Sequence, residues 1–248
     1  MSGHFQRIAL FVIADEVLKG EVSDLNTGFF IEELNKIGVE MLIAAVIPDN
    51  VAAITRFIRT VIDEVDYVIL TGGIGPTPDD VTREAVSETL GIPLVTDPDA
   101  EKILEEYYGG KVHGERLRMA RVPEGSLLIP NPVSGAPGFV IGKVMVFPGI
   151  PSMVKTMFPF AKKYFRDVAV RRAVFYLKAG ESSYSDIMRE VVKKYSSLSV
   201  GSYPTVDSGY RARIVIRGKD LDTIKECVNH FENRLSERNI DVQEKFFE

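Results

Sequence analysis

The chain has 248 residues, of which 45% are hydrophobic, so it can bury a sizeable core. Its 30 basic and 35 acidic side chains give a net charge of −5 without a basic stretch, which argues against binding to the phosphate backbone of a nucleic acid. The single cysteine, Cys227, excludes an intramolecular disulfide and a cysteine-cluster metal site, and no apolar run approaches membrane-spanning length. We therefore expect a cytoplasmic protein that binds neither nucleic acid nor a membrane.

Predicted strands and helices alternate along the first two thirds of the chain. A continuous apolar run at 8–13 is typical of a parallel strand that is buried on both faces. Apolar residues at helical spacing follow it, and Gly38 and Gly91 stand where two helices should end. This order predicts a doubly wound α/β domain with a mostly parallel sheet. Strands are expected at 8–13, 41–47, 67–71 and 144–147, and helices at 26–37, 51–65, 79–90, 98–107 and 151–165.

The pattern changes near residue 172. The following segments predict the order β-α-β-β-α, which is typical of a small α+β domain with an antiparallel sheet. We therefore divide the chain into an α/β domain at 1–171, which holds the ligand site, and a small α+β domain at 172–248.

The glycine-rich segment at 71–82, T-G-G-I-G-P-T-P-D-D-V-T, joins a predicted strand to a predicted helix. Bare glycines let a ligand approach the backbone, and a helix N-terminus directs free N–H groups toward anions. Asp79 and Asp80 at this N-terminus would repel a bare phosphate but would accept a phosphate or diphosphate that is bridged by a metal ion. A tight turn would also explain the glycines, and Asp is a common helix cap, so both structural alternatives stay open.

Further carboxylates follow other predicted strands. Asp49 ends the strand next to the one that leads into the glycine-rich segment, and Asp15 and Glu16 follow the first strand. Ligands of open α/β sheets bind outside the carboxyl ends of the strands, so Asp49 and Asp80 are expected to converge there. Helix capping by Asp49 and a solvated loop at 15–16 are the alternatives.

Several motifs carry a family resemblance. The chain contains D-E-V-L-K-G at 15–20, N-T at 26–27, G-G-I-G-P-T-P-D-D-V-T at 72–82, G-A-P-G at 135–138 and F-P-G-I-P at 147–151. In this order they resemble the molybdopterin-binding-like (MoCF biosynthesis) domain superfamily. Within it, the chain is similar to the N-terminal region of CinA-type competence/damage-inducible proteins and to the molybdopterin-binding-like domain of eukaryotic FAD synthases.

The chain also departs from these relatives. Ala14 replaces a usual glycine, and Ser134-Gly135 stands where many relatives have Gly-Thr. The nicotinamide-nucleotide amidase domain of CinA proteins and the nucleotidyl-transferring domain of FAD synthases are not expected in this chain. Neither of those two activities is therefore assigned to it.

The resemblance implies a metal-dependent pyrophosphatase that hydrolyses FAD or ADP-ribose to AMP plus FMN or ribose phosphate. Asp80 and Asp49 are the expected catalytic residues, and the cation would be Mg²⁺, Mn²⁺ or Co²⁺. The expected metal ligands are Asp80, Asp49, Asp79, Asp15 and Glu16. The expected ligand-binding residues are Thr71, Gly72, Gly73, Gly75, Pro76, Thr77, Asn26, Ser134, Gly135, Gly138, Pro148 and Gly149.

Two other functions fit the same resemblance. One is binding of molybdopterin or the molybdenum cofactor, or adenylylation of molybdopterin. The other is a non-catalytic nucleotide or pterin sensor whose second domain recruits a partner. In each case the ligand is a small nucleotide or pterin, and the resemblance implies a homo-oligomer.

Overall fold

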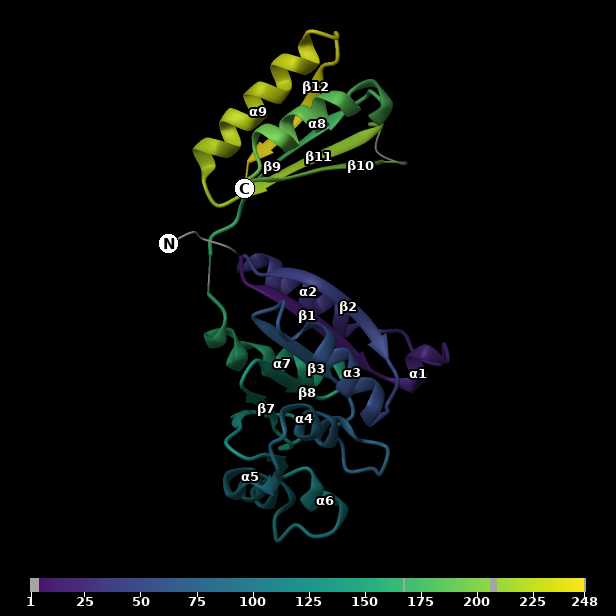
Figure 1. The fold of residues 1–248 in the computed structure, drawn as a ribbon, viewed down its shortest axis with the longest axis vertical. Coiled ribbons are helices and arrows are strands. Elements are labelled where there is room, and N and C mark those ends of the chain that lie inside the picture. Colours follow the sequence, from purple (N-terminus) through teal and green to yellow (C-terminus); the bar gives the residue numbers. More distant parts are fainter. Residues whose placement is uncertain (1–4, 167, 206–208, 248) are drawn as a thin grey trace. The chain divides into compact units, whose positions relative to one another are not determined.

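The computed structural model describes residues 5–166, 168–205 and 209–247, and these form two compact units (Figure 1). Unit 1 spans Met1–Asp167 and unit 2 spans Val168–Glu248. The first strand of unit 2 begins at Arg171, so the predicted border at 171/172 falls inside this strand.

Unit 1 is built on a six-stranded sheet with the order β2-β1-β3-β8-β7-β6. The first four strands run parallel, and at one edge β7 pairs antiparallel with β8 and β6 pairs antiparallel with β7. The prediction of a doubly wound, mostly parallel sheet is thus confirmed. The strands are β1 (Arg7–Ile13), β2 (Glu40–Ile47), β3 (Tyr67–Thr71), β6 (Leu127–Ile129), β7 (Gly138–Ile141) and β8 (Val144–Phe147), and β4 (Leu94–Thr96) pairs separately with β5 (Arg121–Pro123).

Strand β1 shows why the sheet carries helices on both faces. Every residue of β1 after Arg7 is buried, and successive side chains point to opposite faces. Phe11 joins the core cluster that includes residues of α3 and α4, whereas Leu10 joins the cluster that includes residues of α2 and α7. The helices of unit 1 are α1 (Asp15–Leu18), α2 (Asn26–Lys36), α3 (Val51–Val61), α4 (Thr82–Leu90), α5 (Pro98–Tyr108), α6 (Glu115–Arg118) and α7 (Pro151–Ala161), followed by the 3-10 turn η1 (Lys162–Tyr164).

The carboxylates that precede α3 and α4 do not cap these helices. Helix α4 begins at Thr82, so Asp79 and Asp80 lie in the turn before it, and no side chain caps it. Helix α3 is capped by Asn50, whose side chain accepts a hydrogen bond from the N–H of Ala53, so Asp49 is not its cap. The carboxylates of the glycine-rich region are therefore available for other contacts.

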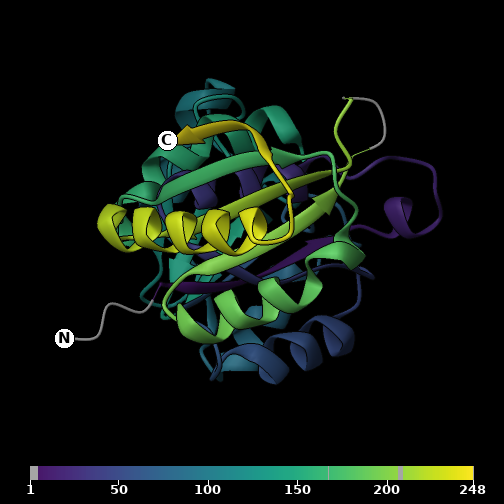
Figure 2. The same ribbon diagram turned by 90° about the horizontal axis from the view of Figure 1, so that it is seen from above.

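Unit 2 is a four-stranded antiparallel sheet with the order β10-β11-β9-β12. Its helices α8 and α9 lie side by side on one face of this sheet (Figure 2). The fold has the predicted α+β character, with one further strand, β12, at its end. The elements are β9 (Arg171–Leu177), the 3-10 turn η2 (Glu181–Ser183), α8 (Ser185–Lys194), β10 (Ser199–Pro204), β11 (Ala212–Gly218), α9 (Leu221–Ser236) and β12 (Val242–Phe247).

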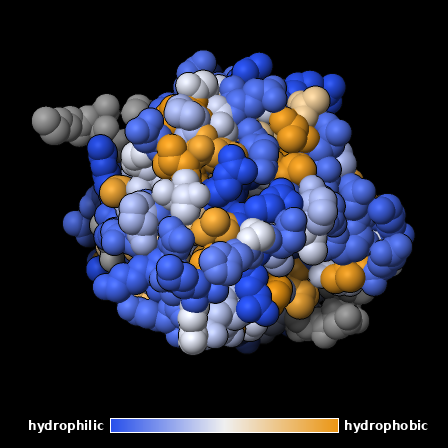
Figure 3. Space-filling model, turned by 90° about the horizontal axis from the view of Figure 1, so that it is seen from below, coloured by the Kyte–Doolittle hydropathy of each residue, from blue (hydrophilic) through white to orange (hydrophobic). Residues whose placement is uncertain are grey.

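One face of the molecule can be judged for apolar patches from its surface colouring (Figure 3). The face seen in Figure 3 is mostly hydrophilic, and its hydrophobic residues lie in small separate groups. Among the residues that the structure describes, no helix has the length and apolar character needed to cross a membrane.

Candidate functional site

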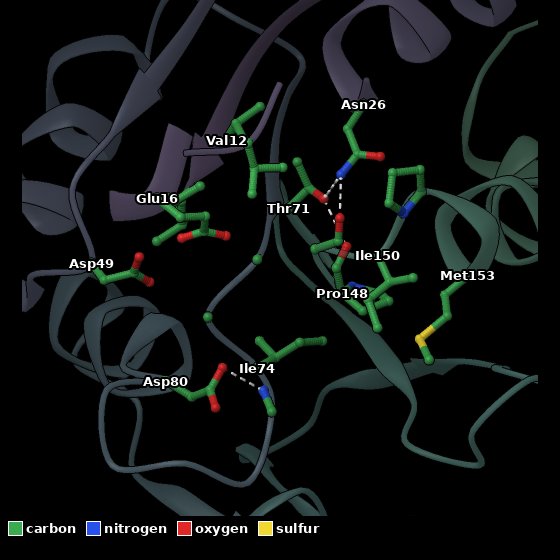
Figure 4. A pocket seen from close by; sticks show the side chains of 18 of the residues that line it. Val12, Glu16, Asn26, Asp49, Thr71, Ile74, Asp80, Pro148, Ile150 and Met153 are labelled. Carbon is green, nitrogen blue, oxygen red and sulfur yellow. Dashed lines mark hydrogen bonds between the residues drawn. The ribbon is translucent and has the colours of Figure 1, made fainter. Parts of the chain in front are cut away.

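A cavity of about 590 Å³ opens at the carboxyl ends of the neighbouring strands β1 and β3. Val12 and Ile13 at the end of β1, Thr71 at the end of β3 and Pro148 after β8 contribute to its wall. The volume lies in the range of small-molecule sites, and the carboxyl edge of an open α/β sheet is the usual place for one. The glycine loop, residues 72–76, crosses this edge (Figure 4).

At two of its positions, the glycine loop packs so tightly that a side chain would not fit. Gly72 has φ +108°, and a Cβ atom there would lie 2.2 Å from the carbonyl oxygen of Ile13. Gly73 has φ +64°, and a Cβ there would lie 2.3 Å from Oγ1 of Thr82. Both positions require glycine because of conformation and space together.

Two consecutive N–H groups of the glycine loop remain free. The N–H of Gly72 donates to the carbonyl of Phe147, while Thr82 occupies two loop carbonyls, with its hydroxyl on Gly72 and its N–H on Gly73. Within the described part of the chain, no hydrogen bond uses the N–H of Gly73 or of Ile74. Adjacent unpaired backbone N–H groups are suited to bind an anion such as a phosphate.

Asp80 closes the glycine loop on itself. Its Oδ1 accepts the N–H of Gly75 at 2.7 Å, and its Oδ2 accepts the N–H of Thr77 at 2.9 Å and the hydroxyl of Thr77 at 2.5 Å. Thr77, predicted as a ligand-binding residue, is therefore directed to Asp80 and does not line the cavity. Asp80 lines the cavity and keeps one lone pair on Oδ1 for a further contact.

Asp49 and Asp15 are joined by two reciprocal hydrogen bonds, each from a backbone N–H to the other residue's carboxylate. The N–H of Asp15 donates to Oδ2 of Asp49 at 3.0 Å, and the N–H of Asp49 donates to Oδ1 of Asp15 at 3.3 Å. Burial raises the pKa of Asp49, and the charges of Glu16, Asp15 and Asp80 raise it further, against the lowering effect of the N–H of Asp15. Asp49 thus has an increased affinity for a proton.

The five carboxylates predicted as metal ligands are not assembled into one cage. Among the described residues, no group of three or more His, Cys, Asp or Glu side chains is placed to hold a metal ion. Asp80 is occupied by loop donors, and Asp15 lies outside the cavity and contacts Lys19 at 3.3 Å. Glu16, Asp49, Asp79 and Asp80 do line the cavity. Carboxylate oxygens are the ligand type that a hard cation prefers.

Asn26 and Thr71 form a buried polar tie at the cavity wall. Nδ2 of Asn26 donates to Oγ1 of Thr71 at 3.0 Å and to the carbonyl of Gly149 at 2.7 Å, and the Thr71 hydroxyl donates to the carbonyl of Pro148 (Figure 4). These bonds join the start of α2 to the ends of β3 and β8. Oδ1 of Asn26 is buried and has no hydrogen-bond partner within the described structure.

The predicted ligand residues after β6 have mainly structural contacts. The hydroxyl of Ser134 lines the cavity but accepts a hydrogen bond from Asn131 at 2.8 Å. Gly135 packs on Tyr107, and Gly138 is buried in β7, where a Cβ would lie 2.3 Å from the carbonyl oxygen of Val146. Neither glycine lines the cavity, so close packing rather than the approach of a ligand explains why each position is glycine.

The cavity lining also has an apolar part, here called the apolar wall, which was missed in the sequence. It is formed by Tyr108, Met119, Ile150 and Met153. Ile150 and Met153 lie on the opposite side of the glycine loop from Asp49, Glu16 and Asp80 (Figure 4). The guanidinium of Arg116 lies 4.2 Å from the ring centre of Tyr108. The cavity thus has an acidic end and an apolar end, as a ligand with a charged and a planar part requires.

Only Ile150 and Met153 had a signal in the sequence, because both stand beside the P-G-I-P turn at 148–151. Tyr108 ends α5 and Met119 follows α6, and tertiary packing alone brings them to the site.

Two family models match consecutive parts of the chain. The model described as "Probable molybdopterin binding domain" matches residues 9–166, and that of "FAD synthase, middle domain" matches residues 169–244.

Similar proteins come from bacteria and archaea. A CinA-like protein of Fusobacterium nucleatum is 30% identical over 93% of this chain, which spans 59% of that protein. A protein of Archaeoglobus fulgidus is 28% identical, with 91% of this chain and 96% of that protein covered. The crystal structure of the protein CinA with unknown function from Thermoplasma acidophilum is 30% identical, with a TM-score of 0.61 over 64% of this chain and 99% of that one.

Proposed function

The chain belongs to the molybdopterin-binding domain family, in the CinA-like group, and from this membership we propose that it hydrolyses the diphosphate linkage of a nucleotide. The substrate class is FAD or ADP-ribose, and the products are AMP plus FMN or ribose phosphate. The observation that supports this proposal is the pair of free N–H groups at Gly73 and Ile74, with carboxylates on one side and an apolar wall on the other.

Each part of the cavity has a role in this reaction. The N–H groups of Gly73 and Ile74 bind oxygens of the diphosphate. The apolar wall around Tyr108 receives the planar ring system. Asp80 keeps the loop in the shape that exposes these donors.

Asp49 is the candidate general base. Its raised pKa increases its affinity for a proton, so the ionised carboxylate can accept one from a water molecule that attacks phosphorus. The water oxygen forms the new P–O bond while the bridging P–O bond breaks and its electron pair leaves with the second phosphate. A divalent cation would be held by Asp80 and would withdraw charge from phosphorus, which leaves Asp49 to act as the base.

The experiment is a substrate and metal screen. Purified protein is incubated with FAD and with ADP-ribose, each with Mg²⁺, Mn²⁺ or Co²⁺, and AMP is measured by chromatography. Asp49→Asn and Asp80→Ala should abolish AMP formation, whereas Asp63→Asn, an exposed carboxylate outside the cavity, should not. Absence of AMP with every metal, or full activity of Asp49→Asn, would contradict the proposal.

A second candidate is binding or adenylylation of molybdopterin. The family model over residues 9–166 favours it, and the apolar wall would accept a pterin as readily as a flavin. A pterin–nucleotide product from molybdopterin and ATP would support it.

A non-catalytic sensor is the third candidate. It is favoured by the absence of an assembled metal cage among the described side chains. Thermal stabilisation by FAD, ADP-ribose or molybdopterin without turnover would support it.

A further inference from the structure

Two arginines hold the carbonyl groups of the segment that follows the free N–H groups. Nη1 of Arg83 donates to the carbonyl of Gly75 at 3.4 Å. Nη1 of Arg118 donates to the carbonyl of Thr77 at 3.1 Å, and its Nη2 to that of Asp80 at 3.5 Å. Three carbonyls within residues 75–80 are thus bound by arginines, while Asp80 binds two N–H groups of the same segment.

Arg83 is a buried cation that joins two walls of the cavity. It lies in the first turn of α4 and is 3% exposed. Besides Gly75, it donates from Nη2 to the carbonyl of Met119 at 3.4 Å, and the side chain of Met119 belongs to the apolar wall. Its Nε is buried and lacks a partner within the described structure, and burial lowers its pKa to about 10.

The contacts of Arg83 are unusual for a stabilising residue. They are long bonds to neutral carbonyls, and burying a charge without an ion-pair partner opposes folding, although the negative charges of Glu84 and Asp80 raise its pKa in part. A packing role would be filled better by an apolar side chain of the same size. This suggests that the cation serves the site rather than the free energy of folding.

Arg118 links the same elements from the surface. It lies in α6, its side chain is 26% exposed, and it pairs with Glu115 at 3.3 Å and with Glu84 of α4 at 3.6 Å. Through Arg118, residues 115–119 are tied both to α4 and to the backbone of Thr77 and Asp80.

We propose that Arg83 and Arg118 are positioning residues of the nucleotide site, which fix the loop at 72–80 against residues 115–119. They keep the free N–H groups of Gly73 and Ile74 at a constant distance from Asp49 and from the apolar wall. Arg83 also places a buried positive charge beside a cavity lined by Glu16, Asp49, Asp79 and Asp80, which offsets part of the repulsion of a diphosphate. This inference rests on the proposed nucleotide site.

Measurement of KM for the nucleotide distinguishes a positioning role of the arginines from a role in folding alone. A variant that merely folds less well lowers the number of active molecules, so kcat per total protein falls while KM stays constant. A displaced loop weakens the binding of substrate and transition state together, so KM rises in fully folded protein. We expect Arg118→Gln to raise KM for ADP-ribose about 10-fold, since small misplacements in a site have effects of this size or larger.

Three further variants complete the test. Arg118→Lys should raise KM less than Arg118→Gln, because an ammonium keeps the charge but cannot bind two carbonyls in a planar fork. Glu115→Gln removes an exposed ion-pair partner of Arg118 without touching the loop and should leave KM unchanged. Arg83→Met removes the buried cation and should also raise KM. If this variant does not fold, the Arg118 variants alone test the positioning role.

Hydrogen exchange of the ligand-free protein gives an answer that does not depend on turnover. In Arg118→Gln, the hydrogen-bonded N–H groups of Gly75, Thr77 and Asp80 should exchange at least about 10-fold faster than in the unsubstituted protein, with the core of β1 unchanged. If the unsubstituted protein forms no AMP, the proposed function fails, and exchange together with the Kd for AMP still tests the positioning role. Unchanged KM or Kd and unchanged exchange in Arg118→Gln, or an equal effect of Glu115→Gln, would overturn the inference.

Discussion

The acidic and apolar ends of the cavity differ in how the chain builds them. The acidic end uses residues from the segments that follow β1, β2 and β3, and the carboxylates of Asp49 and Asp80 both accept backbone N–H groups. The apolar end uses Tyr108 at the end of α5, Met119 after α6, and Ile150, which is 53% exposed. The acidic end is therefore held by hydrogen bonds to the backbone, whereas the apolar end depends on how distant segments pack.

The largest expected effect comes from removing the tight loop that separates the two ends. Gly72→Ala would place a Cβ against the carbonyl of Ile13 at a positive φ, so we expect the free energy of unfolding to fall by about 3 kcal/mol or more. Gly91→Ala is the matched control, since Gly91 has φ +66° in open space and strain alone predicts a loss of about 1–2 kcal/mol. Equal losses in urea unfolding of the two variants would show that the loop is not tightly packed.

Asp49→Asn tests the chemistry of the acidic end. We expect hydrolysis to fall by about 100-fold or more, because the candidate base is lost while the side-chain shape is kept. AMP formation under saturating substrate measures this effect. A smaller loss would assign the acidic end to binding alone.

The raised pKa of Asp49 makes a separate prediction about pH. A folded-state pKa above the ordinary value of 3.8 means that the folded protein binds this proton more tightly than the unfolded chain. The contribution of Asp49 to stability is thus fully present below pH 3.8 and is lost as pH rises through the folded pKa. In denaturant unfolding across this pH range, Asp49→Asn should lack this loss, while the rate of hydrolysis by the unsubstituted protein should rise through the same window.

Tyr108→Ala tests the apolar end. Loss of the ring should weaken FAD or ADP-ribose binding by about 10-fold, in line with about 1–3 kcal/mol for stacking of one base. Titration measures Kd, and Tyr108→Phe, which keeps the ring, should bind normally. If Tyr108→Ala also binds normally, the planar part of the ligand lies elsewhere.

The smallest effect is expected at the outer margin of the acidic end. Lys19 pairs with Asp15 at 3.3 Å, but both side chains are about half exposed. Lys19→Ala should change the free energy of unfolding by at most about 0.5 kcal/mol and leave hydrolysis intact. A larger effect on hydrolysis would place Lys19 within the site.

The mostly parallel sheet was predictable because its strands are buried on both faces and their apolar runs are continuous. The edge strand β12 was not, since the sequence V-Q-E-K-F-F lacks alternation and five of its six residues are exposed. The role of Asp80 was also hidden, because a sequence does not show whether a carboxylate points at a ligand or at the N–H groups of its own loop.

Local sequence alone determined the family, the sheet and the position of the glycine loop at its carboxyl edge. These follow from burial periodicity, from glycine conformation and from short motifs, all of which act within a few residues. Tertiary structure alone decided that Asp15 and Thr77 point away from the cavity and that Tyr108 and Met119 complete it. It also decided that Arg83 and Arg118 bind the loop carbonyls, because such contacts depend on which distant segments the packed core brings together.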